Sequence, residues 1–184
     1  AWELNGEPLP LAHGGPVRMV VPGYTGVNNV KYIRQLAFTA AQSPAKIQQS
    51  SYRFTPVGVK GSPDAPSLWK VPVNSWIVSP GEKAAAGRVQ VAGVAFGGFH
   101  AAKGVEVSFD GGETWTAAKW FGPDLGRYAW RNFVVEVELK PGTYRIASRA
   151  TNDQGESQPK ERVENERGYN NNSWLDRSVE LVVT

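Results

Sequence analysis

The feature that most constrains the fold is a series of short segments in which apolar and polar residues alternate. From about Lys70 onward, KVPVNSWIVSP, GRVQVAGVAF, NFVVEVEL and GTYRIASRATN all show this alternation, and Gly, Pro or Asp separates each from the next. A period of two is typical of half-buried β-strands. Six or seven such segments at roughly ten-residue spacing predict a mainly β fold, an antiparallel β-sandwich of immunoglobulin type.

The sharpest local signal in this region is the stretch FDGGETW. Asp110, Gly111 and Gly112 tolerate positive φ, so they predict a hairpin turn between Val107 and Trp115. We expect Trp115 and Trp130 in the core of the sandwich. The 20 Gly and 13 Pro, with seven Trp, six Tyr and seven Phe, agree with many turns between aromatic-rich strands.

The part before the sandwich is organised differently. Residues 1–40 are punctuated by Pro and Gly and contain one short strand signal, Val17 to Val21. Residues 41–68 are polar and irregular, which indicates a boundary between two packed units. We therefore predict a first segment at 1–55, a linker at 56–69 and the sandwich at 70–184.

Composition excludes several classes of function. The 20 Lys and Arg are spread among 17 Asp and Glu, so no basic stripe fits nucleic acid. No apolar run approaches the roughly 18 residues of a membrane span, and no signal peptide opens the chain. The chain also opens without Met, and we expect that further sequence precedes it.

Self-contained catalysis is not indicated. The only histidines are His13 and His100, and the chain has no Cys and no Gly-x-Ser-x-Gly elbow. The same inventory predicts no metal site within this chain. His100 is expected to be a loop residue.

What remains is a set of cations and one tyrosine outside the regular strands: His13, Arg18, Lys31, Tyr52 and Arg167. Arg offers a planar fork of donors and Lys a point charge, so such a set suits a phosphate or another oxyanion. Taken singly, each residue also fits a structural role. The cations fit solvated surface charges, Tyr52 a packing residue in a loop, and His13 a turn.

The chain resembles the sulfite oxidase family of molybdenum-cofactor oxidoreductases. WELNGEPLPLAHGGPVRMVVPGYTGVNNVKYIRQL is similar to the end of the family's molybdopterin-binding domain, through its NG-x-PLP, HG-x-PVR, VVPG and VKW-like motifs. GVAFGG followed by VEVSFDGGETW is similar to the family's dimerisation domain. The resemblance covers essentially all 184 residues. It implies that 1–55 are the C-terminal segment of an α+β molybdopterin-binding domain, and that 70–184 are an immunoglobulin-like dimerisation domain.

The resemblance also implies roles for the five candidate residues. His13 and Arg18 in HGGPVR would contact the terminal phosphate of the molybdenum cofactor (Mo-molybdopterin), and Lys31 in VKY would line the same pterin site. Tyr52 in QQSSYRFTP would be the active-site tyrosine. Arg167 in NERGYNNNSW would bind the oxyanion substrate.

The activity so implied is the oxidation of sulfite to sulfate by oxygen-atom transfer, as in a periplasmic bacterial sulfite dehydrogenase. The expected partners are a cytochrome c-type electron acceptor and a second copy of the chain, in a homodimer. The family's molybdenum-ligating cysteine is absent, so an N-terminal half, in the same or a separate chain, would supply it. No Cys-x-x-Cys-His haem motif is present, and the stretch after Tyr52 is shorter than in the animal enzymes.

Other functions stay open at this point. A related sulfane dehydrogenase or nitrate reductase shares the resemblance, although Arg167 favours sulfite over nitrate, because the nitrate enzymes tend to have an apolar residue there. A non-catalytic dimerisation module would use the sandwich alone. A carbohydrate-binding sandwich with exposed Trp would leave HGGPVR unexplained.

Overall fold

The computed structural model describes residues 1–184 and divides them into two units. The first unit comprises Ala1–Val71 together with Glu164–Asn170. The second comprises Pro72–Val163 together with Asn171–Thr184. None of the helices has the length and hydrophobicity that a membrane span requires.

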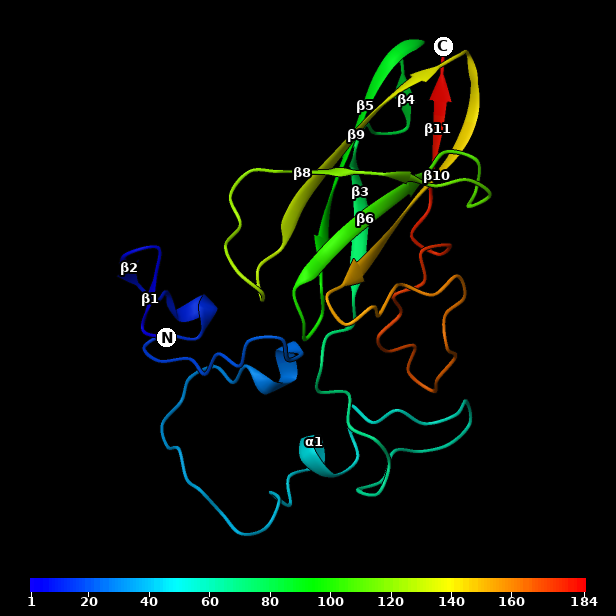
Figure 1. The fold of residues 1–184 in the computed structure, drawn as a ribbon. Helices are drawn as coiled ribbons and strands as arrows, with labels where there is room; N and C mark the ends of the chain where they lie inside the picture. Colours follow the sequence, from blue (N-terminus) through cyan, green and yellow to red (C-terminus); the bar gives the residue numbers. More distant parts are fainter. The chain divides into compact units, whose positions relative to one another are not determined.

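The second unit is a β-sandwich of two sheets (Figure 1). One sheet has the order β4-β11-β10-β6-β7 and the other β3-β5-β9-β8. All strand pairs are antiparallel except β4 with β11. The strands are β3 (Asn74–Ser79), β4 (Lys83–Ala84), β5 (Gly87–Phe96), β6 (Ala102–Ser108), β7 (Thr116–Ala117), β8 (Lys119–Phe121), β9 (Arg131–Leu139), β10 (Gly142–Asn152) and β11 (Val179–Val183). The prediction of a mainly β, antiparallel sandwich is confirmed.

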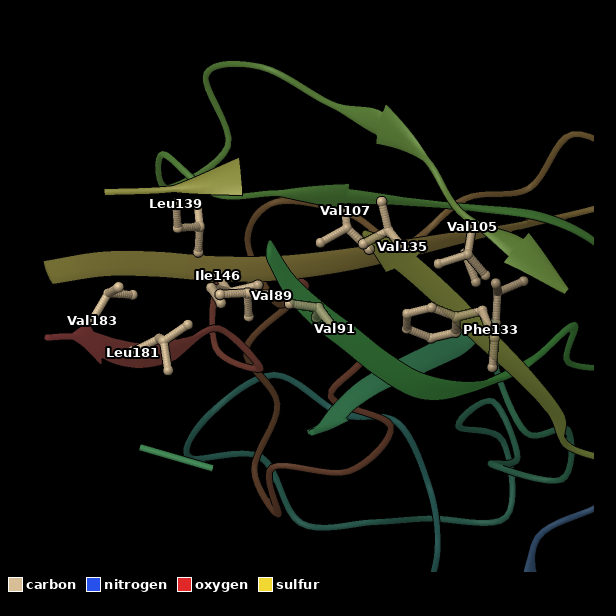
Figure 2. Packing of buried hydrophobic residues seen from close by; sticks show 13 residues of the cluster. Val89, Val91, Val105, Val107, Phe133, Val135, Leu139, Ile146, Leu181 and Val183 are labelled. Carbon is tan, nitrogen blue, oxygen red and sulfur yellow. The ribbon is translucent and has the colours of Figure 1, made fainter. Parts of the chain in front are cut away.

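The alternation read from the sequence determines which side chains enter the core. In β5, Val89 and Val91 are buried whereas Arg88 and Gln90 are exposed. Because successive strand residues point to opposite faces, this pattern turns one face of each sheet inward. Figure 2 shows the resulting apolar layer, to which both sheets contribute. Its members include Val89, Val91, Val105, Val107, Phe133, Val135, Leu139, Ile146, Leu181 and Val183.

One glycine is required by this packing. Gly93 of β5 pairs with Phe133 of β9. A Cβ at position 93 would lie 2.4 Å from Cζ of Phe133 and 2.1 Å from the carbonyl oxygen of Trp76. The ring of Phe133 therefore occupies the space above a residue that has no side chain, as glycines in strands often allow.

The predicted hairpin is confirmed as the β6–β7 connection, in which Val107 pairs with Thr116. Gly111 and Gly112 have φ of 74° and 101°. The carboxylate of Asp110 accepts hydrogen bonds from the backbone and the hydroxyl of Thr114, at 2.9 Å and 2.5 Å. These bonds to Thr114, with a further one from the Ser108 hydroxyl, hold the pKa of Asp110 well below its ordinary value.

The tryptophan prediction was wrong for Trp130, which is 42% exposed. It precedes β9, and the first buried residue of that strand is Phe133. Its ring packs on Trp76, with centroids 4.5 Å apart, and on Phe96, with centroids 5.2 Å apart. Trp115 is half-buried, and its ring lies in a T-shaped arrangement with that of Trp174, with centroids 5.1 Å apart.

The first unit has little regular structure. Its elements are β1 (Glu3–Leu4), β2 (Glu7–Pro8), η1 (Leu11–His13), η2 (Gly26–Asn28) and α1 (Lys46–Gln49). The strand predicted at Val17 to Val21 does not form. Single backbone hydrogen bonds, such as that from Met19 to Val30, tie this stretch to its neighbour without building a ladder.

The boundaries of the two units differ from the predicted ones in two places. The stretch 56–69, interpreted as a linker, belongs to the first unit, where Phe54 N–H donates to Pro66 O at 2.8 Å and Leu68 is buried. Glu164–Asn170 also belongs to the first unit, although the strands on either side of it lie in the sandwich. Contacts between segments of the chain, rather than composition, decide both assignments.

Candidate functional site

A cavity of about 340 Å³ in the first unit brings two of the predicted site residues together. Tyr52 and Arg167, far apart in the sequence, both line it. The other lining residues are Lys46, Ser50, Ser51, Arg53, Thr55, Lys60, Gly61, Glu166 and Tyr169. The returning segment 164–170 thus contributes an arginine and an aromatic ring to a cavity otherwise built from residues 46–61.

Tyr52 has an unusual backbone conformation, with φ of 52°. A non-glycine residue in the left-handed region costs on the order of 1–3 kcal/mol, so its surroundings must hold it there. Its carbonyl accepts a hydrogen bond from Leu68 N–H at 2.9 Å. Its ring stacks on that of Tyr169, with centroids 5.4 Å apart and planes at 22°. No protein group in residues 1–184 hydrogen-bonds to its hydroxyl, which is therefore available to a ligand.

Arg53 holds the backbone beside Tyr52. It is only 7% exposed, and its Nη1 donates to Ala65 O at 3.0 Å and to Ser67 Oγ at 2.6 Å. Its Nη2 donates to Gln48 O, the carbonyl of a residue in α1. One guanidinium therefore joins the helix to the loop at 65–67, with the strained residue 52 between them.

An asparagine-braced turn delivers Arg167. The side chain of Asn165 is buried, and its amide donates to Tyr169 O at 2.9 Å and its Oδ1 accepts from Tyr169 N–H, also at 2.9 Å. Gly168, with φ of 64°, closes the turn through a bond from its N–H to Asn165 O. The brace leaves the side chain of Arg167 without a protein partner.

Two hydrogen bonds dock this turn on the rest of the first unit. Glu166 N–H donates to Thr55 O at 3.0 Å. The Glu166 carboxylate accepts from Gly58 N–H at 2.6 Å. The position of Arg167 is thus set by its neighbour in the sequence.

The cavity carries an excess of positive charge. Lys46, Arg53, Lys60 and Arg167 line it, against the single carboxylate of Glu166. None of the four cations forms a salt bridge in the structure. Cations that converge without carboxylate partners favour an anion, and Arg gives the contact its geometry.

The other three predicted residues lie together elsewhere in the first unit. His13 and Arg18 line a second cavity, of about 230 Å³. Arg18 Nη1 donates to His13 O at 3.3 Å, and Lys31 Nζ donates to Ala12 O at 2.9 Å. A Cβ at Gly14 would lie 2.8 Å from Cβ of Lys31, so the close approach of this lysine depends on glycine.

These three residues fit the phosphate end of a cofactor. They supply N–H donors from residues 13–31, and no salt bridge pairs them with a carboxylate, although Glu3 also lines the second cavity. Residues 1–184 contain no group of three or more His, Cys, Asp or Glu side chains placed to hold a metal ion. His100 lies 3.8 Å from Asp153 in the sandwich and has no part in either cavity.

Sequence reasoning missed several residues of the first cavity. Lys46, Arg53, Lys60 and Tyr169 all line it, and only the fold shows this. A signal existed for two of them: Arg53 directly follows Tyr52 in SSYRF, and Tyr169 lies two residues after Arg167 in ERGYN.

The fold and the two cavities define a β-sandwich protein whose first unit holds a cavity lined by four cations and one carboxylate. Comparison with known proteins gives the family. Residues 1–47 match the family model described as the oxidoreductase molybdopterin binding domain, and residues 65–181 match the Mo-co oxidoreductase dimerisation domain. The chain belongs to the sulfite oxidase family of molybdenum-cofactor oxidoreductases.

Individual relatives agree with this assignment. The chain is 36% identical to mitochondrial sulfite oxidase of Macaca fascicularis, over 95% of the chain and 34% of the relative. It is 32% identical to the inducible NADH nitrate reductase 2 of Glycine max, over 95% of the chain and 22% of the relative. The crystal structure of the sulfane dehydrogenase SoxCD from Paracoccus pantotrophus superposes with a TM-score of 0.82 at 29% identity, covering 98% of this chain and 49% of that one. The chain thus spans about a third of the length of the sulfite oxidases that it matches.

Proposed function

We propose that this chain is part of a molybdenum enzyme that oxidises sulfite to sulfate by oxygen-atom transfer and passes the electrons to a cytochrome c-type acceptor. The observation that carries the proposal is the meeting of Tyr52 and Arg167 in one cavity with surplus positive charge. Membership of the family supports it, and the identity to sulfite oxidases is slightly above that to nitrate reductases.

His13, Arg18 and Lys31 would hold the phosphate of the molybdenum cofactor. Arg18 can bind a phosphate with two parallel bonds, and Lys31 adds a point charge. When bound, the cofactor supplies the oxygen atom and takes up two electrons from sulfite. The cysteine that ligates molybdenum in this family would come from sequence outside residues 1–184.

Arg167 and Tyr52 would act on the substrate. The guanidinium of Arg167 binds an oxygen of the anion and offsets the repulsion between it and other negative charge in the site. The hydroxyl of Tyr52 donates a hydrogen bond to the reacting oxygen. Buried Arg53 and the two lysines keep the cavity positive, so the anion enters in preference to neutral molecules.

The test is sulfite-dependent reduction of cytochrome c by the cofactor-loaded protein. Arg167→Ala should raise KM for sulfite roughly 10- to 100-fold, because a hydrogen bond to a charged group is worth about 1.5–3 kcal/mol. Tyr52→Phe should lower turnover and leave the cofactor bound. Arg88→Ala, which removes an exposed ion pair with Glu136 in the sandwich, is the matched control. An unchanged KM in Arg167→Ala would contradict the proposed role, and turnover of a sulfane or of nitrate instead of sulfite would reassign the substrate.

We also infer that the sandwich has immunoglobulin-type connectivity and forms a homodimer. The sheet orders β3-β5-β9-β8 and β4-β11-β10-β6-β7, with β4 parallel to β11, support the first inference. The match to a dimerisation domain supports the second, and sedimentation of the intact protein would test it. A periplasmic location stays a prediction, which fractionation of the source cells would check.

A further inference from the structure

The left-handed backbone of Tyr52 is the most demanding conformation in the first cavity. Arg53 and Leu68 restrain its main chain. Neither contact fixes the side chain, which is 38% exposed. The hydroxyl of Tyr52 has no protein partner, so no hydrogen bond within residues 1–184 limits the directions in which the phenol points.

The ring of Tyr169 is the one aromatic contact of Tyr52. The two planes lie within 22° of each other at a centroid distance of 5.4 Å, which is a stacked arrangement. Aromatic pairs of this kind contribute beyond their buried area and prefer definite orientations. Because both residues line the cavity, the stack restricts the phenol of Tyr52 inside the site.

Tyr169 is itself held firmly. Its N–H and its carbonyl both bond to the side chain of buried Asn165, at 2.9 Å each. The same turn carries Arg167, whose N–H lies 3.4 Å from Asn165 Oδ1. The turn therefore carries at once the arginine of the site and the ring that restrains Tyr52.

We propose that Tyr169 is a positioning residue, whose ring fixes the Tyr52 hydroxyl relative to the Arg167 guanidinium. The turn 165–169 is then a rigid spacer between the two groups that contact the anion. This inference rests on the proposed function, because it assigns Tyr52 and Arg167 to the same bound oxyanion.

The test is a double-mutant cycle in the cofactor-loaded protein. Tyr169→Leu removes the ring, and Tyr169→Phe keeps the ring while it removes the hydroxyl. We expect kcat for sulfite to fall roughly 10- to 100-fold in Tyr169→Leu, since small misplacements of a reacting group cost up to about that much. Tyr169→Phe should stay near the wild type. In a Tyr52→Phe background, Tyr169→Leu should lower kcat no further.

Two outcomes would overturn the positioning role. A loss of the same factor in the wild-type and Tyr52→Phe backgrounds would show that Tyr169 does not act through the Tyr52 hydroxyl. An equal loss in Tyr169→Phe would show that the ring is not the relevant part. Should Tyr169→Leu fail to fold, Tyr169→Met allows the same comparison.

Sulfate binding by calorimetry separates this inference from the proposed function. If the positioning role holds, Tyr169→Leu raises the Kd for sulfate several-fold in the wild-type background and leaves it unchanged in the Tyr52→Phe background. This result is expected whichever substrate the loaded enzyme turns over, so absence of sulfite oxidation would count against the proposed function alone. An unchanged Kd for sulfate in Tyr169→Leu would count against the positioning role alone.

Discussion

Arg53→Met is the substitution with the clearest consequence for the candidate site. It removes three hydrogen bonds from a buried guanidinium, to Gln48 O, Ala65 O and Ser67 Oγ. Hydrogen bonds to a charged group contribute about 1.5–3 kcal/mol each, whereas the burial of the charge costs several kcal/mol. The net loss of stability should be about 2 kcal/mol, because Ala65 O loses its partner whereas Gln48 O keeps a hydrogen bond from Gln42 Nε2.

This loss should be local to residues 46–67. We expect amide exchange in that stretch to become roughly 30-fold faster, since about 2 kcal/mol corresponds to that factor. The assay is hydrogen–deuterium exchange with mass spectrometry, and peptides from β5 and β9 serve as the internal control. Arg53→Lys should show an intermediate effect, because a lysine can replace at most some of the three hydrogen bonds of the guanidinium.

Unchanged amide exchange in residues 46–67 of Arg53→Met would refute the reasoning, since the three hydrogen bonds of Arg53 would then contribute nothing to local stability. Equal acceleration in the sandwich would also contradict it, because the effect would not be local. We further expect a rise in KM for sulfite, as the backbone of Tyr52 loses its restraint.

Three further predictions concern the sandwich and the cofactor loop. Gly93→Ala should lower the free energy of unfolding by about 2–3 kcal/mol in urea, because the new methyl meets a packed ring and a backbone oxygen; Gly104→Ala, where nothing lies within 4 Å, is the control and should be neutral. Asp110→Asn should destabilise the protein at pH 7. The lowered pKa of Asp110 means that its carboxylate stabilises the fold above the unfolded pKa. The difference from wild type should therefore shrink as the pH falls below about 4, which thermal unfolding against pH checks; a pH-independent difference would contradict it. Arg18→Gln should reduce molybdenum content in purified protein several-fold, whereas His100→Ala should not, as measured by elemental analysis.

The strands of the sandwich could be predicted because alternation is a local property. Val89 and Val91 in β5 alternate with polar residues, and a strand with that pattern has only one way to bury its apolar face. The hairpin at Asp110 could be predicted for a similar reason, because positive φ at Gly111 and Gly112 is a demand that few residues meet. The exposure of Trp130 could not be predicted, because it depends on where β9 begins and on which neighbours its ring meets.

The first unit shows the limit of local signals. Val17 to Val21 has the composition of a strand but no adjacent strand to pair with, and a strand needs partners for its backbone groups. The stretch 56–69 has the composition of a linker, yet Arg53 and Leu68 bind it into the unit. In both cases tertiary contacts decided the outcome.

The sequence alone determined the strand pattern, the turn chemistry and the candidate residues His13, Arg18, Lys31, Tyr52 and Arg167. Only the tertiary structure decided that Tyr52 and Arg167 share a cavity, and that Arg53 and Tyr169 restrain the tyrosine. The physical reason is that alternation and turn preferences act over a few neighbouring residues. A site is assembled by contacts between residues more than a hundred positions apart in the chain, such as the bond from Gly58 to Glu166.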